Sequence, residues 1–114
     1  MSDCIFCKIV KREIPAKMIY EDDELLAFYD LAPQAPVHFL VIPQKHISNL
    51  MALEPVDIAF MGRLLHKAQE LAVKLGCGEK GARFVINCKS DGGQTVDHLH
   101  IHVLGGRPLA WPPG

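Results

Sequence analysis

Three histidines, His98, His100 and His102, occupy alternate positions in the run Gln94–Leu104. In a β-strand alternate side chains share one face, so this spacing predicts a row of imidazoles along a strand, with the intervening apolar side chains on the other face. A strand at the edge of a sheet with one solvent-exposed face also carries polar residues. That alone does not explain why three of the chain's six histidines lie within so short a run. The row therefore indicates a chemical role.

Two chemistries suit such a row. A His-x-His pair with a third histidine is a catalytic zinc arrangement. Alternatively, a neutral imidazole attacks an electrophile such as phosphorus and divides one displacement into two easier ones. The preceding loop, Asp91–Thr95, favours the second chemistry, because its two glycines bring backbone N–H groups close to an anion and its last two residues add amide and hydroxyl donors. We therefore expect a phosphate beside the histidines.

The run Gly92–Pro108 resembles the signature of the histidine triad (HIT) superfamily, which is His-x-His-x-His followed by two apolar positions. Further blocks, in the same order, resemble the Hint branch of that superfamily, the nucleoside phosphoramidate hydrolases: Glu13–Ala16, Ala32–Pro36, His38–Pro43, Lys45–Ser48 and Trp111–Gly114. The resemblance covers nearly the whole chain. It implies a homodimer that hydrolyses purine nucleoside phosphoramidates, as an adenosine 5′-monophosphoramidase does, releasing AMP and an amine through a covalent nucleotidyl-histidine.

The resemblance also assigns roles to residues. His100 is the expected nucleophile, and His102 and His38 are expected to support and orient it. Thr95 stands where this branch usually has Ser and is expected to donate a hydrogen bond to the phosphate. Asp30 is expected to accept from both ribose hydroxyls, which a carboxylate can do at once. The other expected nucleotide-binding residues wall the base pocket or surround the phosphate: Phe6, Ile14, Phe28, Leu31, Asn87, Gly93 and Gln94.

Cys4 and Cys7 lie one helical turn apart, which is half of a structural zinc site. By itself, without a second pair of ligands, this spacing favours two buried thiols on a core-facing turn. Some HIT relatives bind zinc with such a Cys-x-x-Cys and two histidines, and His46 and His98 are available here. The resemblance thus implies a structural zinc at these four residues, with no cofactor required for catalysis.

Size and charge restrict the class of protein. The 114 residues predict a single domain, residues 1–114. A formal net charge of −1 argues against a protein that binds nucleic acid through bulk charge. The apolar runs are short, so no membrane span is predicted. The start Met-Ser-Asp-Cys lacks the features of a secretory signal, and we expect a cytoplasmic protein with reduced thiols.

Hydrophobic periodicity predicts the elements that position these residues. A short helix is expected over residues 2–12, capped by Ser2 or Asp3, and a long amphipathic helix over 53–75. Strands are expected over 18–21, 25–29, 37–42 and 82–88, with the triad stretch as the fifth. The sum is an α+β domain with an antiparallel sheet of about five strands. The short Pro-rich tail is expected to dock through its Trp111.

Two other functions are compatible with the histidine row. The first is another enzyme of the same superfamily, a dinucleoside polyphosphate hydrolase or nucleotidyl transferase. The Gly-Gly-Gln-Thr loop and the Trp-Pro-Pro-Gly ending speak against it. The second is a non-catalytic nucleotide-binding protein, which would have no need of the central imidazole.

Overall fold

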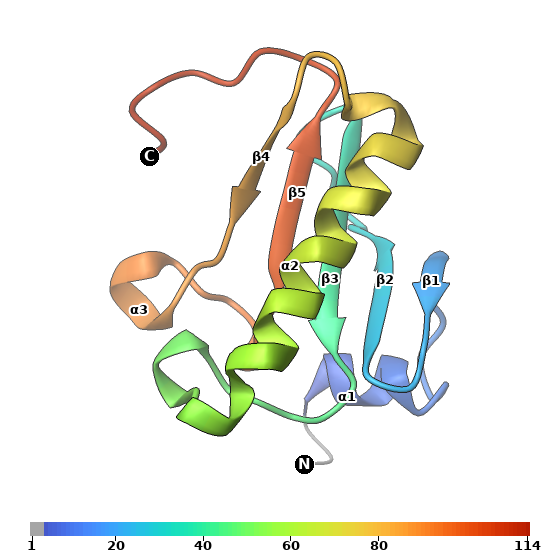
Figure 1. The fold of residues 1–114 in the computed structure, drawn as a ribbon, viewed down its shortest axis with the longest axis vertical. Coiled ribbons are helices and arrows are strands. Elements are labelled where there is room, and N and C mark those ends of the chain that lie inside the picture. Colours follow the sequence, from blue (N-terminus) through green and yellow to red (C-terminus); the bar gives the residue numbers. More distant parts are fainter. Residues whose placement is uncertain (1–3) are drawn as a thin grey trace.

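In the computed structural model, which describes residues 4–114, a five-stranded antiparallel sheet carries helices on both faces (Figure 1). The strands lie side by side in the order β1-β2-β3-β5-β4. Their bounds are Met18–Glu21 (β1), Leu25–Tyr29 (β2), Val37–Pro43 (β3), Ala82–Val85 (β4) and Ile101–Gly105 (β5). The predicted α+β architecture is confirmed. No helix within residues 4–114 is long and apolar enough to cross a membrane.

Helix α2 (Ile58–Ala72) packs along one face of the sheet (Figure 1). The side chains of Leu64, Ala68 and Leu71 are buried there. They pack against alternate residues of the strands: Leu25, Ala27, Phe39, Val41, Ile101 and Val103. Burying one large aliphatic side chain stabilises a fold by roughly 1.5–3 kcal/mol, so this layer is the main core.

Helix α1 (Ile5–Val10) packs against the opposite face. It buries Phe6 and Ile9 against the other alternate set of strand residues: Leu26, Phe28, Leu40 and Ile42. Because side chains alternate along a strand, this face of β3 and β5 also carries His38 and His102. The histidines therefore lie on the α1 face, and α2 supports the strands from behind.

Both helix predictions need correction at their ends. The first helix is six residues long rather than 2–12, and its N-cap is Cys4, whose Sγ accepts from the backbone N–H of Cys7. The expected caps Ser2 and Asp3 lie outside the described residues. The expected helix over 53–75 is divided into a 3-10 turn (Pro55–Asp57), α2 and a π-turn (Val73–Cys77). Two further helical turns were not predicted: Leu50–Ala52 and α3 (Lys89–Gly92).

The triad strand begins later than predicted. Strand β5 starts at Ile101, so His98 and His100 precede it. The reason is at the end of β3, where Pro43 has no N–H for the ladder, and the backbone N–H of Leu99 donates to the carbonyl oxygen of Ile47 instead, at 2.7 Å. The alternation nevertheless continues through this extended segment, since the residues between the histidines are buried on the α2 side.

Two further expectations also need correction. Strand β4 ends at Val85 rather than at 88. In the tail, the side chain of Trp111 is 81% exposed, so it is not docked on its own chain. Figure 1 shows this tail leaving the end of β5 and turning back on the side of β4, where the side chain of Arg83 donates to the carbonyl oxygen of Ala110 at 2.7 Å.

Candidate active site

The three histidines of the triad lie next to one another on the α1 face. The ring centroids of His100 and His102 are 4.9 Å apart. The ring of Phe6, from α1, meets His98 and His100 edge-on, with centroid distances of 5.8 and 5.2 Å. His98 and His100 are buried, and His102 is partly buried. The row predicted from the spacing is confirmed.

One hydrogen bond sets the protonation of His100. Its Nδ1–H donates to the carbonyl oxygen of His98 at 2.7 Å. A neutral imidazole carries one N–H, so Nε2 of His100 keeps its lone pair. Burial lowers the pKa of His100, which keeps the ring neutral near pH 7. His100 thus has the form that a nitrogen nucleophile requires.

A chain of hydrogen bonds sets the protonation of the neighbouring pair. The backbone N–H of Gln34 donates to His38 Nδ1 at 3.0 Å, which places the proton of neutral His38 on Nε2. That N–H donates to His102 Nδ1 at 3.0 Å, while Asp30 Oδ2 lies 3.5 Å from His38 Nε2. Burial, then the nearby His100 and His38, lowers the pKa of His102 to about 4. The proton of neutral His102 is therefore on its free Nε2.

Asp30, His38 and His102 also lie close enough to one another for a metal ion. A metal at His38 Nε2 would need that nitrogen unprotonated and the proton on Nδ1. Nδ1 instead accepts from the backbone N–H of Gln34, so the two N–H groups would point at each other. The arrangement fits a hydrogen-bonded relay and does not fit a metal centre.

A cavity of about 240 Å³ opens beside the row, between α1 and the sheet. Its lining includes the following residues that the sequence predicted: Phe6, Ile14, Phe28, Asp30, Leu31, Thr95, His100 and His102. It also includes residues that were missed: Ile5, Ile9, Pro15, Ala16, Tyr29, Leu40 and Val96. Ile5 and Ile9 are separated by one helical turn, and that spacing could have identified them as a wall. Most of the lining is apolar, with polar groups at the histidine end.

Three of the predicted nucleotide-binding residues, Asn87, Gly93 and Gln94, lie outside the lining of this cavity in the described part of the chain. The Gln94 amide is engaged by three backbone groups, two in its own loop and one at Ser48. Its Oε1 accepts from the backbone N–H of Lys89 at 2.8 Å, and its Nε2 donates to the carbonyl oxygens of Ser48 and Val96, both at 2.9 Å. Gln94 therefore holds the loop that carries Thr95.

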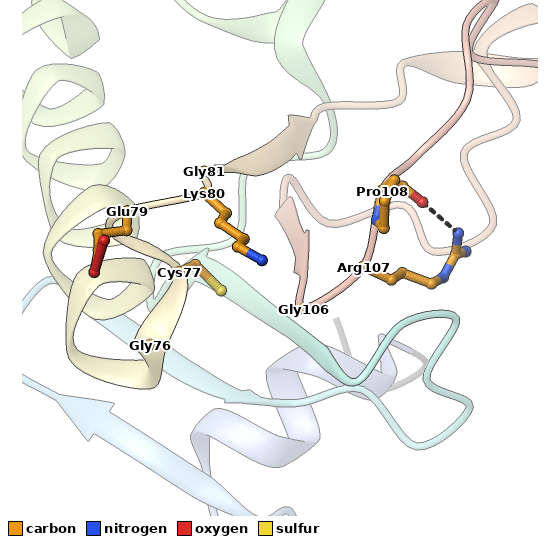
Figure 2. Close-up of a pocket in the computed structure, with 8 residues that line it drawn as sticks. All are labelled: Gly76, Cys77, Glu79, Lys80, Gly81, Gly106, Arg107 and Pro108. Carbon is orange, nitrogen blue, oxygen red and sulfur yellow. Dashed lines mark hydrogen bonds between the residues drawn. The ribbon is translucent and has the colours of Figure 1, made fainter.

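A larger hollow of about 500 Å³ lies at the other end of β5, where α2 ends (Figure 2). It is lined by Gly76, Cys77, Glu79, Lys80, Gly81, Gly106, Arg107 and Pro108. Figure 2 shows Cys77 and Lys80 pointing toward its middle and Glu79 pointing away. None of the site residues predicted from the sequence lines it, so the smaller cavity beside the histidines is the candidate active site.

At the His98 end of the triad, the four predicted metal ligands lie close together: Cys4, Cys7, His46 and His98. Their donor atoms all lie within 4.8 Å of one another. His98 Nδ1 lies 3.3 Å from Cys4 Sγ and 3.6 Å from Cys7 Sγ, and His46 Nδ1 lies 3.2 Å from Cys7 Sγ. Burial, then the neighbouring Cys4, raises the pKa of the Cys7 thiol.

The orientation of His98 also suits a ligand. Its Nε2–H donates to the carbonyl oxygen of Pro43 at 2.8 Å, which leaves the Nδ1 lone pair directed at the two sulfurs. Burial lowers the pKa of His98 to about 4, so its neutral form is held.

Comparison with known proteins places this geometry in a family. The HIT domain family matches residues 11–109. The chain belongs to the HIT family. An uncharacterized HIT-like protein of Synechocystis is 57% identical over 112 residues, covering 98% of this chain and 97% of the relative. The histidine row therefore lies within the part of the chain that matches the HIT domain.

Solved structures agree. A HIT family hydrolase from Legionella pneumophila superposes on this HIT domain with a TM-score of 0.96 at 47% identity, covering 98% of this chain and all of the other (100%). A structure described as a zinc-bound histidine triad family protein from Mycobacterium smegmatis has a TM-score of 0.79 at 35% identity, covering 93% of this chain and 76% of that one.

Proposed function

We propose that this HIT protein hydrolyses purine nucleoside phosphoramidates to AMP or its purine analogue and an amine, through a nucleotidyl group carried by His100. The observation that carries the proposal is the bond from His100 Nδ1 to the carbonyl oxygen of His98, which leaves Nε2 as a buried, neutral nucleophile beside an apolar cavity. The description of the Legionella pneumophila relative as a hydrolase supports the class of reaction.

In the first step, His100 Nε2 forms a bond to phosphorus and the P–N bond to the amine breaks. The departing nitrogen needs a proton, because an amide ion is a very poor leaving group. His102 Nε2–H is the available hydrogen-bond donor to that nitrogen, and the 3.0 Å bond from His38 Nε2–H to His102 Nδ1 keeps it in this tautomer. A water molecule supplies the proton and becomes hydroxide. In the second step, hydroxide attacks phosphorus, the P–N bond to His100 breaks with its electron pair returning to Nε2, and the nucleotide leaves.

The cavity supports a nucleoside as the substrate. Apolar side chains from α1, β2 and the segment after α1 suit a purine base. Asp30 lines the same cavity next to His38, where a carboxylate can accept from ribose hydroxyls. Thr95, exposed at the histidine end, has its hydroxyl available for a phosphate oxygen.

The test is AMP release from adenosine 5′-phosphoramidate by the wild type, by His100→Ala and by His66→Ala, all in chelator. His66 is exposed on α2 and serves as the matched control. We expect activity in the wild type and in His66→Ala only. A dinucleoside polyphosphate turned over faster than the phosphoramidate would favour the other enzyme class of the superfamily, and nucleotide binding without turnover would favour a binding protein.

We also propose a structural zinc at Cys4, Cys7, His46 and His98. A tetrahedral zinc with bonds of about 2.3 Å to sulfur and about 2.05 Å to nitrogen separates S and N by about 3.6 Å. The S–N separations of 3.2–3.6 Å in the cluster fit that geometry. When bound, the metal cross-links α1, the segment after β3 and the segment before β5. Zinc content near one per chain in protein purified without chelator would support the site, and a content near zero would refute it.

We further propose that the protein is a homodimer and that it works in the cytoplasm. Strand β4 is an edge of the sheet, its Phe84 is 40% exposed, and Trp111 in the tail is 81% exposed, so one face of the single chain offers apolar surface to a second copy. Cysteine ligands must stay reduced, which suits the cytoplasm. Light scattering of the purified protein should give twice the chain mass, and a monomer would contradict the proposal.

A further inference from the structure

Cys4 and Cys7 are arranged as a pair as well as two ligands. Cys4 is the N-cap of α1, and the backbone N–H of Cys7, in the first turn, donates to its Sγ at 3.3 Å. Both sulfurs reach the same nitrogen, His98 Nδ1, so they lie on the same side of the helix. Side chains three residues apart on a helix have Cβ atoms about 5–6 Å apart, so a modest shift of the first turn brings the sulfurs into bonding distance.

We propose that Cys4 and Cys7 form a redox-active dithiol that hydrogen peroxide oxidises to an intramolecular disulfide, and that this disulfide excludes zinc. The exclusion of zinc rests on the zinc site proposed above, whereas disulfide formation does not. A sulfur in a disulfide has lost its thiolate charge and no longer binds the metal strongly, so each chain holds either the disulfide or the ion.

The two sulfurs differ in the way that a reactive and a resolving cysteine differ. Cys4 is partly exposed and Cys7 is buried (7% exposed), so peroxide from solvent reaches the Cys4 sulfur first. The Cys4 thiolate attacks peroxide, gaining OH and releasing hydroxide. Cys7 sulfur then attacks Cys4 sulfur, forming the S–S bond and expelling hydroxide, which takes up the Cys7 proton as water. Peroxide is reduced by two electrons and the dithiol is oxidised by two.

Helix α1 also forms part of the nucleotide cavity, so oxidation of Cys4 and Cys7 affects the residues of that cavity. Phe6 lies between the two cysteines in sequence, and its ring contacts His100. His98 loses its sulfur partners on oxidation, and its carbonyl oxygen is the acceptor that orients His100. We therefore expect the oxidised protein to bind AMP more weakly than the reduced protein.

The experiment treats metal-free and zinc-loaded protein with stoichiometric peroxide and follows three signals: free thiols, zinc released to a coloured chelator, and the mass of the tryptic peptide ending at Lys8, which holds both cysteines. In metal-free protein we expect loss of two of the four thiols and loss of two hydrogens from that peptide, both reversed by dithiothreitol. In zinc-loaded protein we expect slower oxidation, with one zinc released per disulfide.

Cys88→Ser is the matched control, because Cys88 is a partly exposed thiol outside the cluster, and it should behave as the wild type. Cys7→Ser should give no disulfide, and peptide mapping of the wild type serves if that variant does not fold. Oxidation confined to Cys88, or bonds between chains, would overturn the inference. Disulfide formation at equal rates in the metal-free and the zinc-treated protein, with no zinc released, would refute only the zinc site. Equal AMP affinity of the oxidised and reduced forms would overturn the coupling to the cavity.

Discussion

Lowering the pH should destabilise this protein through His102 in particular. Burial and its neighbours lower the pKa of His102 from 6.5 in the unfolded chain to about 4 in the folded protein. Below pH 6.5 the unfolded chain therefore binds the proton more tightly than the folded chain does. The stabilisation is complete above pH 6.5 and is lost as the pH falls toward 4.

The size of this effect follows from the two pKa values. Between about pH 7.5 and pH 5.5 the unfolded histidine takes up nearly one proton and the folded one takes up almost none. Each unit of pKa difference that the pH crosses costs about 1.4 kcal/mol, and the pH falls about one unit below the unfolded pKa, so His102 should account for about 1.3 kcal/mol of lost stability over this range. The other buried histidines add losses of the same sign.

Urea unfolding of the wild type and of His102→Gln at the two pH values isolates this contribution. A glutamine keeps an acceptor for the N–H of His38 but does not titrate. The variant should lose about 1.3 kcal/mol less than the wild type, whereas His66→Gln, at an exposed position, should lose as much as the wild type. Equal losses in the wild type and His102→Gln would refute the account of a neutral, desolvated His102.

Three more changes test separate parts of the structure. Gly105→Ala places a Cβ 2.5 Å from Cys77 Sγ and should lower the free energy of unfolding by about 1–3 kcal/mol in a thermal melt, with most of the loss restored by adding Cys77→Ala. Gln94→Ala removes three hydrogen bonds of the loop that carries Thr95. Expressed as free energies, the loss in kcat/KM should be larger than the loss in the free energy of unfolding. Phe6→Ala empties the wall beside His100 and should raise KM for the nucleotide substrate.

The sequence predicted which residues make up the site better than it predicted the hydrogen bonds that hold them. Alternation placed His98, His100 and His102 on one face, and that holds although the strand starts only at Ile101. The starting point depends on Pro43 in the adjacent strand and on the bond from Leu99 to Ile47, neither of which a periodicity within one segment can reveal.

The roles of polar side chains were the hardest to predict. Gln94 was expected to face a phosphate, but its amide bonds to two backbone groups of its own loop and to the carbonyl oxygen of Ser48, which is far away in the sequence. The protonation of His38 depends on the backbone N–H of Gln34, which residue types cannot show. Likewise, Cys4 caps α1 with a sulfur, whereas propensity favours hydroxyl and carboxylate caps. Such bonds arise only once the chain has folded around them.

The most direct test of the central claim is to trap the covalent intermediate. Wild-type protein is mixed with excess adenosine 5′-phosphoramidate and quenched within one turnover in alkali, where a phosphorus–nitrogen bond to histidine survives, and its peptides are mapped by mass spectrometry. The account predicts a nucleotidyl group on His100, absent from His100→Ala. An adduct on His98 or His102, or turnover of the substrate by His100→Ala at the wild-type rate, would contradict it.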